Sequence, residues 1–411
     1  MAQSSSTRGA PAPNEAAAPL CPHHRLLGGF VAICPVVSLV SARGMATFLV
    51  AGALALLLAR PRSLALSPLR GAIAALGSLV LLAAASVVWS SAPEISRVQT
   101  LQLIGIAVPG LLVIGSFLGH RARTIAEKPS RWLPYGFAFA AWILLLEQLL
   151  DFPLYRLLHL LPAGGEVEAY VHNKAATALA VLLCPTLLAQ TCNGAAGSSL
   201  GGTRRQAALA ALALLAILST PSQSALVAAT GGLIVLAAAR WRERLVRNGI
   251  VYLSIAVAVA APAIALILPP DASTTLGWLP YSAAQRIEIW RHIGQAIAEH
   301  PLLGIGIDGA RHTLSVAPGS IEGALHPHNA FLQIWLELGV IGVAWLVGFL
   351  LFLGSLIGRM PVEARPYADA ALAAAVLVSS FAWGIWQTWW IATLFVSAAL
   401  LVAGARARDA G

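Results

Sequence analysis

The sequence predicts an all-α polytopic integral membrane protein, with about twelve transmembrane helices and a large loop between the ninth and the tenth. Hydrophobic residues make up 58% of the chain, charged residues only 10%, and the mean hydropathy is +0.78. Soluble globular domains carry about 25% charged residues, so this composition excludes that class. The 411 residues provide enough length for about twelve helices of roughly 20 residues each, plus one sizeable loop.

Apolar segments of roughly spanning length recur along the chain. They cover residues 26–41, 44–59, 71–89, 98–118, 132–150, 175–192, 206–218, 224–239, 248–268, 330–355, 366–384 and 386–404. Four of these segments are each shorter than about 18 residues and form two pairs, 26–41 with 44–59 and 206–218 with 224–239. Each pair also fits a tight hairpin or half-buried segments.

These segments divide the chain into five parts. Residues 1–25 lack an apolar core and predict a disordered tail. Residues 26–268 hold nine spans, 269–329 form the large loop, 330–404 hold the last three spans, and 405–411 form a second tail. The four cysteines show no paired spacing of the kind that a disulfide framework has.

The positions of Lys and Arg predict the orientation in the membrane. Of 26 such residues, 19 lie on the side of the N-terminus. The other seven are Arg43, Arg97, Arg156, Lys174, Arg286, Arg291 and Arg311. Because cytoplasmic loops are enriched in Lys and Arg, both termini are predicted in the cytoplasm and the large loop outside. The net charge of +9 is then explained by anchoring at the inner leaflet and is no evidence for nucleic-acid binding.

Topology gives no reason for the seven outside cations. Arg43, Arg97 and Lys174 lie at the outer ends of predicted spans. Each one alone could reach toward lipid headgroups. Alternatively, the three together surround an external anionic site. Arg291 and Arg311 lie in the loop and are further candidates for contacts with an anion, and Asp308 is a candidate for orienting a histidine or binding a sugar hydroxyl.

The large loop holds the densest group of polar residues. Residues 283–300 place apolar side chains at the spacing of an amphipathic helix at the membrane surface, namely Ile287, Trp290, Ile293 and Ile297. Pro301 ends this helix, and the glycines that follow over 304–309 form either a loose turn or a backbone nest for an anion.

The sequence His326-Pro327-His328-Asn329 precedes the tenth predicted span. Two histidines without a nearby carboxylate pair make an incomplete metal site, so no metal is predicted. A histidine near neutral pKa can accept a proton from a hydroxyl nucleophile, which makes His328 a candidate general base. The alternative is a histidine that only caps the helix.

The order R…W…HPLLGIG…HPHN…LQIWLELGVIG over 281–345 resembles the signature region of the bacterial O-antigen ligase and O-antigen polymerase superfamily. Trp89-Ser90 with Pro93, and the stretch 171–176, resemble weaker landmarks of that family. The resemblance implies a polytopic protein of the bacterial inner membrane that moves lipid-linked glycans on the periplasmic face.

The resemblance implies an inverting glycosyltransferase that uses an undecaprenyl-diphosphate-linked glycan and needs neither a metal, a cofactor nor a nucleotide sugar. It implies that His328 is the catalytic base and that Arg286 holds the donor diphosphate. Asn329 and His326 are further candidates for substrate binding. A guanidinium fork stabilises the negative charge that develops on a leaving diphosphate. The acceptor is the lipid A core oligosaccharide in a ligase, or a second lipid-linked glycan in an O-antigen or exopolysaccharide polymerase.

One position departs from the family pattern. Many relatives carry Ser-Arg-Gly between the seventh and eighth spans, where this chain has Ser222-Gln223-Ser224. Lys174 and Arg97 are the first candidates to replace the missing cation, with Arg43 as a third.

A polysaccharide transporter or flippase is the alternative from another class. Transporters place ionisable residues at mid-membrane, and Glu147, Asp151 and Glu337 are the acidic residues near span ends that bear on this alternative. A cluster of four tryptophans over 383–390 is predicted to form an interfacial aromatic belt rather than a platform for sugars.

Overall fold

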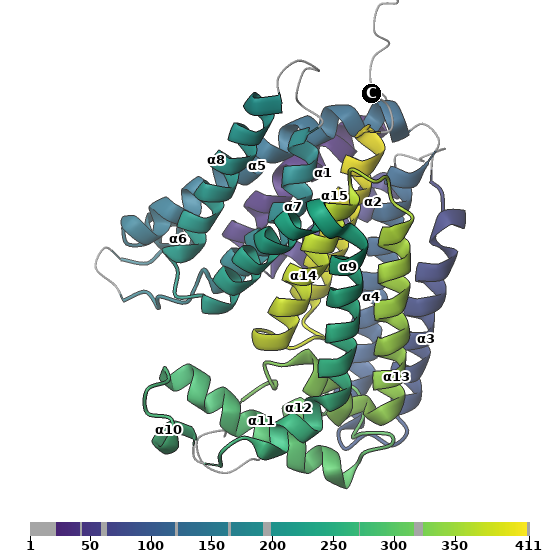
Figure 1. The fold of residues 1–411 in the computed structure, drawn as a ribbon, viewed down its shortest axis with the longest axis vertical. Helices are drawn as coiled ribbons and strands as arrows, with labels where there is room; N and C mark the ends of the chain where they lie inside the picture. The colour runs from purple at the N-terminus through teal and green to yellow at the C-terminus, as the bar shows by residue number, and fades with distance from the viewer. Residues whose placement is uncertain are drawn as a thin grey trace, which may run out of the picture.

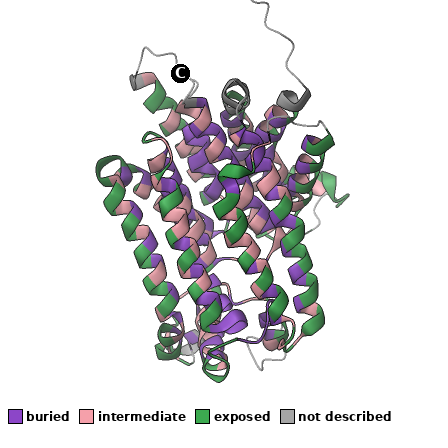
Figure 2. Cartoon of the chain, turned by 90° about the vertical axis from the view of Figure 1, so that its right-hand side faces the viewer, coloured by how far each residue is buried: buried purple, intermediate pink, exposed green. Residues whose placement is uncertain are grey.

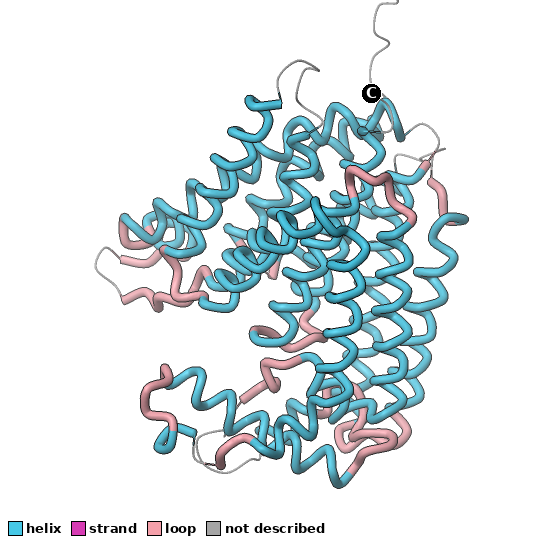
Figure 3. The backbone as a smooth tube through the Cα atoms, in the orientation of Figure 1, coloured by secondary structure: helices cyan, strands magenta, loops and turns pink. Residues whose placement is uncertain are grey.

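The computed structural model describes residues 22–41, 43–58, 64–119, 122–162, 166–191, 199–270, 272–315 and 324–408. Within these ranges the chain is helical and contains no strand, which confirms the all-α prediction (Figure 3). The helices are α1 (Pro22–Val40), α2 (Gly44–Leu58), α3 (Arg70–Ser86), α4 (Pro93–Leu118), α5 (Ala122–Leu149), α6 (Pro153–Leu158), α7 (Asn173–Thr191), α8 (Ser199–Leu218), α9 (Gln223–Ile267), α10 (Ala272–Thr275), α11 (Tyr281–Glu299), α12 (Ala310–Ser315), α13 (Ala330–Gly358), α14 (Arg365–Phe381) and α15 (Thr388–Arg408), with a short 3-10 turn η1 (Ser67–Leu69) before α3.

Seven helical segments in the described part of the chain are long and apolar enough to cross a membrane. They are Ser67–Ser86, Pro93–Leu118, Arg131–Leu149, Asn173–Thr191, Gln223–Ile267, Ala330–Gly358 and Thr388–Ala407. Each predicted apolar segment overlaps a helix, but the apolar parts of α1 and α2 are shorter than a span. A membrane protein is therefore supported, while the number of twelve crossings is not confirmed.

Helix α9 joins two segments that the hydropathy pattern predicts as separate spans. It has 45 residues, which correspond to about 68 Å of helix, more than twice the roughly 30 Å of a bilayer core. Arg242 interrupts it with non-helical angles (φ −136°, ψ 58°). The arms on either side of this kink, 223–241 and 243–267, each have the length of one span.

The helices form a bundle with a buried centre and apolar outer faces. Helix α7 is the most enclosed, since its side chains from Ala175 to Ala189 are all buried. Many large apolar side chains on the outer helices remain exposed, among them Leu81, Phe139, Ile234 and Leu253. Figure 2 shows these exposed faces along the outside of the bundle. Such faces suit a lipid environment.

The loop between α9 and α13 forms a small helical layer at one end of the bundle, and the C-terminus lies at the other end (Figure 1). Helix α11 confirms the predicted helix of this loop. It buries Ile289, Ile293 and Ile297 and packs against α9 and α13. Of the predicted apolar stripe, Ile293 and Ile297 are buried, whereas Ile287 and Trp290 are half-buried. Ile289 takes the place of Ile287 against the bundle.

Helix α13 is broken at Gly339, where the segment after α11 docks. Gly339 has φ 60° and ψ −157°, a conformation that essentially only glycine adopts. A Cβ there would lie 2.3 Å from the Leu302 carbonyl oxygen. The break frees backbone groups of α13, so that Ile305 N–H donates to the Leu336 carbonyl and Val340 N–H to the Pro301 carbonyl.

The glycine-containing stretch 304–309 is neither a loose turn nor an anion nest, so both sequence-based interpretations are wrong. All six of its backbone N–H groups donate within the protein. Their acceptors are the His300 carbonyl, the Leu336 carbonyl, the Glu337 carbonyl, the Ser86 hydroxyl, the Glu337 carboxylate and the Gly306 carbonyl. The stretch therefore fastens the loop to α13 and to the end of α3.

Candidate active site

The backbone around His328 is fixed from both sides. Asn329 is the N-cap of α13, and its Oδ1 accepts hydrogen bonds from Phe331 N–H at 3.0 Å and Leu332 N–H at 3.1 Å. On the other side, Trp290 Nε1 donates to the Pro327 carbonyl at 2.8 Å. His328 itself has a φ of 56°, which is uncommon for a residue other than glycine and occurs preferentially at functional sites.

The imidazole of His328 has a defined tautomer. Its Nδ1 is hydrogen-bonded to the backbone carbonyl of Ala382, at the C-terminal end of α14. A carbonyl oxygen only accepts hydrogen bonds, so Nδ1 carries the proton and donates it. The lone pair of His328 is therefore on Nε2, which makes no hydrogen bond with any described residue.

The surroundings keep this imidazole neutral. Burial lowers the pKa of His328 to about 3, aided by the neighbouring His326 and the charge of Arg286, while the hydrogen bond to Ala382 opposes the change. Near neutral pH, His328 is therefore a base with a vacant nitrogen.

His326 lies beside His328, with the ring centroids 4.1 Å apart and the planes nearly perpendicular at 84°. Burial lowers the pKa of His326, and the positive charges of Arg311, Lys174 and Arg286 lower it further. These three cations, from three separate elements, therefore lie within electrostatic reach of one imidazole. Gly384 makes room for it, because a Cβ there would be 2.7 Å from His326 Cδ2.

Arg286 projects from α11 without a counter-charge. Its side chain is half-buried, and it makes no hydrogen bond or ion pair with any residue that the structure describes. Burial lowers the pKa of this guanidinium. A partly desolvated cation without a carboxylate is costly, so its position favours a site that an anionic ligand completes.

Lys174 and Arg43 add two further cations from other parts of the bundle. The Lys174 ammonium lies over the rings of Trp383 at 5.4 Å and Trp389 at 5.7 Å, the distances of cation–π contacts. Arg43 is exposed and close enough to Lys174 for the two charges to repel. Neither cation pairs with a described carboxylate.

The other predicted cations are already engaged. Arg311 Nε donates to Asp308 Oδ2 at 3.2 Å, and Asp308 is nearly buried. Arg291 Nη1 donates to the Leu266 and Leu268 carbonyls, both at 2.8 Å, and so binds the C-terminal end of α9. Arg97 pairs with the exposed Glu94 at 3.1 Å, one turn away on α4. The structure brings Arg311 near the histidines but shows no such contact for Arg291 or Arg97.

A buried network behind the histidines was not recognised as positioning machinery from the sequence. Glu337 is fully buried on α13 and accepts from Gln333 Nε2 at 3.0 Å, from Asp308 N–H at 2.9 Å and from the Trp386 indole. Gln333 Oε1 accepts from Ile385 N–H at 3.0 Å. This network holds the segment that begins at Ala382, the residue whose carbonyl orients His328.

The predicted tryptophan belt is wrong. Trp386, Trp389 and Trp390 are 4%, 3% and 0% exposed, so they face protein rather than a membrane interface. Trp383 is half-buried, and its indole donates to Thr177 Oγ1 at 3.1 Å. These rings contribute the wall beside Lys174.

Comparison with known proteins finds a similarity over part of the chain. Residues 208–347 match the model of the O-Antigen ligase family. The matched segment contains Arg286, Arg311, His326 and His328, whereas Lys174 and the Ala382 carbonyl lie outside it.

Curated proteins that are similar to part of the chain carry names of the same kind. A Rickettsia bellii protein named "Putative polysaccharide ligase" is 34% identical over 124 residues, which are 27% of this chain and 30% of that protein. The "O-antigen ligase" of Pseudomonas aeruginosa is 32% identical over 146 residues, 35% of this chain and 31% of that protein. Each match therefore spans less than a third of the relative's own length.

Proposed function

We propose that the chain is a membrane glycosyltransferase that moves a glycan from an undecaprenyl-diphosphate carrier to a sugar hydroxyl. The observation that carries this proposal is the combination of unpaired cations, Arg286 and Lys174, with a neutral histidine that has a vacant Nε2. Cations without carboxylates fit a diphosphate, and a neutral imidazole fits deprotonation of a hydroxyl. The match of residues 208–347 to the O-Antigen ligase family model supports the same reaction class.

The donor diphosphate is assigned to the cations. Arg286 offers a planar fork that can contact two phosphate oxygens at once, whereas Lys174 acts as a point charge. Lys174, braced by Trp383 and Trp389, is the replacement for the arginine that relatives carry at the position of Gln223. Arg43 lies next to Lys174 and extends the same positive region.

His328 takes the acceptor proton in one balanced step. The acceptor oxygen attacks the anomeric carbon while its proton passes to Nε2 of His328. The bond from the anomeric carbon to the phosphate oxygen breaks, and its electron pair leaves with the diphosphate beside Arg286. Attack opposite to the leaving group inverts the anomeric configuration.

Donor binding changes the charge around this base. Burial is the main cause of the low pKa of His328, and the charge of Arg286 lowers it further. A bound diphosphate offsets the charge of Arg286 and so removes that part of the lowering.

The acceptor we favour is the lipid A core oligosaccharide, as in an O-antigen ligase, with a second lipid-linked glycan as the alternative in a polymerase. The orientation that accompanies this proposal has the 269–329 loop on the periplasmic face of the inner membrane and both termini in the cytoplasm. The distribution of Lys and Arg supports that orientation. We propose the same division of the chain into tails at 1–25 and 405–411, spans over 26–268 and 330–404, and the loop over 269–329.

The transporter alternative receives no support from two of the three acidic residues that would favour it, Glu147 and Glu337. Glu337 is fully buried among three hydrogen-bond donors. Glu147 is 2% exposed, and its oxygens accept from the N–H groups of Leu154 at 2.6 Å and Tyr155 at 2.9 Å. Both carboxylates are used in holding the fold.

The direct test is transfer by the purified full chain in lipid nanodiscs. An undecaprenyl-diphosphate-linked glycan is supplied together with lipid A core, or with a second lipid-linked glycan, in the presence of a chelator and without nucleotide. Extension of the lipid A core supports the ligase, and extension of the second glycan supports the polymerase. No extension of either acceptor, with the donor intact, contradicts the proposal.

A further inference from the structure

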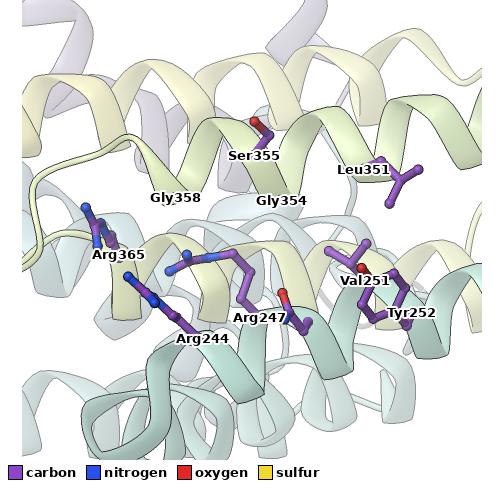
Figure 4. A pocket seen from close by; sticks show the side chains of 10 residues that line it. Arg244, Arg247, Val251, Tyr252, Leu351, Gly354, Ser355, Gly358 and Arg365 are labelled. Atoms are coloured by element: carbon purple, nitrogen blue, oxygen red, sulfur yellow. The ribbon is translucent and has the colours of Figure 1, made fainter.

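A pocket lies at the end of the bundle away from the candidate active site, between α9, α13 and the start of α14 (Figure 4). Its volume is about 410 Å³. The side chains that line it come from the arm of α9 just after the Arg242 kink and from the last two turns of α13. No residue of the candidate active site contributes to it.

One end of this pocket is cationic. Figure 4 shows Arg244, Arg247 and Arg365 close to one another there. Arg247 is buried and held by Asp369, with Nε to Oδ1 at 3.0 Å, and by Glu243. Arg365 Nε donates to the Met360 carbonyl at 2.7 Å, and its Nη1 lies 3.4 Å from the Glu243 carboxylate.

Hydrogen-bond donors remain available on all three arginines. Arg244 makes no hydrogen bond or ion pair with any described residue. Arg247 uses Nε and Nη2 toward the carboxylates, which leaves Nη1 beside Gly358, where an added Cβ would be 3.3 Å away. The two carboxylates offset two of the three charges, so the pocket keeps a net positive charge.

The other end of the pocket is apolar and opens toward the outer face of the bundle. Figure 4 shows Val251, Tyr252 and Leu351 at this end, away from the arginines. Tyr252 is 59% exposed and Leu351 45% exposed. The direction from the arginines to these side chains leads from the bundle end toward the middle of the apolar spans α9 and α13.

We propose that this pocket binds an anionic phospholipid, with the phosphate at the three arginines and an acyl chain along Val251 and Leu351. A cationic end next to an apolar end fits an amphiphile of this kind, and basic pockets between membrane helices bind such headgroups. A soluble phosphate compound would use only the cationic end. The neighbouring pocket beside Arg240 contains the carboxylates of Glu243 and Glu363, so it does not favour an anion.

The test uses the purified full chain in a neutral detergent, and dioleoyl phosphatidylglycerol is titrated while bound lipid is counted by native mass spectrometry. Arg244→Ala removes a guanidinium that supports no contact in the fold, and it is expected to weaken binding about fivefold. Ser355→Trp keeps every charge and fills the pocket from an exposed position of α13, and it is expected to weaken binding at least as much. Arg205→Ala, which removes an exposed arginine of α8, is the matched control and is expected to bind like the wild type.

The outcomes separate the lipid from other ligands. Phosphatidylcholine is expected to bind more weakly than phosphatidylglycerol, and millimolar inorganic phosphate is expected to leave the bound lipid in place. Phosphatidylglycerol should also raise the Tm of the wild type more than that of Arg244→Ala. The proposal is overturned if both pocket variants bind like the wild type, or if inorganic phosphate displaces the lipid at those concentrations.

Discussion

At the scale of single residues, His328 and Arg286 are the two side chains on which the proposed chemistry depends. The structure gives them different kinds of support. His328 is oriented by a hydrogen bond to the Ala382 carbonyl, whereas Arg286 is placed by its helix and makes no contact that holds the fold. Substitution at Arg286 should therefore affect ligand binding without affecting stability.

Arg286→Ala is expected to weaken donor binding by tenfold or more, because a guanidinium contact with a diphosphate is lost. Arg286→Lys should recover only part of it, since an ammonium cannot contact two oxygens in the same plane. The measurement is the KM for the lipid-linked donor in purified variants, together with Tm. An Arg286→Ala variant with an unchanged KM would make this residue a surface cation only.

Arg291→Ala is the matched control for that experiment, since Arg291 lies on the same helix. Its guanidinium binds the Leu266 and Leu268 carbonyls at the end of α9. Its removal should lower Tm by a few degrees, as expected for lost charge-assisted hydrogen bonds, and should leave the donor KM of the folded protein unchanged. The opposite pattern would exchange the roles of the two arginines.

The low pKa of His328 predicts an acid-sensitive fold. Burial and neighbouring charges lower the pKa from 6.5 to about 3, so the unfolded chain binds this proton more readily than the folded chain. The stability that neutral His328 contributes is therefore complete above about pH 6.5 and is lost as the pH falls toward 3. In Tm measurements across this window, His328→Gln should lose less stability than the wild type. If the Tm of the wild type and of His328→Gln changed with pH in the same way, His328 would not be buried as a neutral group.

At the scale of elements, the break in α13 joins the loop to the bundle. Gly339 permits the break, and the freed carbonyls of Leu336 and Glu337 accept N–H groups from the glycine-containing stretch. The same helix begins at Asn329, next to His328, and carries Gln333 and Glu337. A change at the break should therefore disturb the histidine through the network that fixes Ala382.

Gly339→Ala is expected to destabilise the protein by about 3 kcal/mol or more, because the added Cβ meets the Leu302 carbonyl and the backbone conformation suits only glycine. Gly348→Ala, on the same helix with open space around it, should be neutral or stabilising by up to about 1 kcal/mol. Thermal unfolding of the two variants in detergent makes the comparison. Equal Tm values would contradict the break as a structural requirement.

The helices themselves could be predicted from the sequence, because long apolar segments in a membrane protein leave the backbone no other way to satisfy its hydrogen bonds. The docking of the glycine-containing stretch could not be predicted from the sequence. Its hydrogen-bond acceptors include Ser86 and the carbonyls freed by the helix break, and the local sequence pattern does not reveal either. The histidine pair and Arg286 were recognisable as polar groups in an apolar chain. Ala382 and Gly384 were not, because a backbone carbonyl and a missing Cβ carry no signal in sequence.

At the scale of the whole molecule, the chain places two sites at opposite ends of one bundle. The histidines and unpaired cations lie at the end that carries α11, and the arginine pocket lies at the end that carries the C-terminus (Figure 1). The proposed orientation puts the first site in the periplasm and the second at the inner leaflet. This arrangement is consistent with most Lys and Arg residues lying at the second end.

Cysteine labelling tests this orientation. In a background with Cys21 and Cys192, which lie outside the described residues, replaced by Ser, the remaining Cys34 and Cys184 are buried. A membrane-impermeant maleimide should label His300→Cys in intact spheroplasts and should label Arg205→Cys only after permeabilisation. Both positions are exposed. The reverse pattern would place the proposed active site in the cytoplasm.

The rate of glycan transfer by His328→Ala tests the central proposal most directly. With saturating undecaprenyl-diphosphate-linked donor and its acceptor, the variant should lose about two to four orders of magnitude in rate, the contribution of a general base. Arg286→Ala should also be impaired, while His300→Ala, which removes an exposed histidine of the same loop, should transfer like the wild type. A folded His328→Ala protein with wild-type transfer would contradict the account.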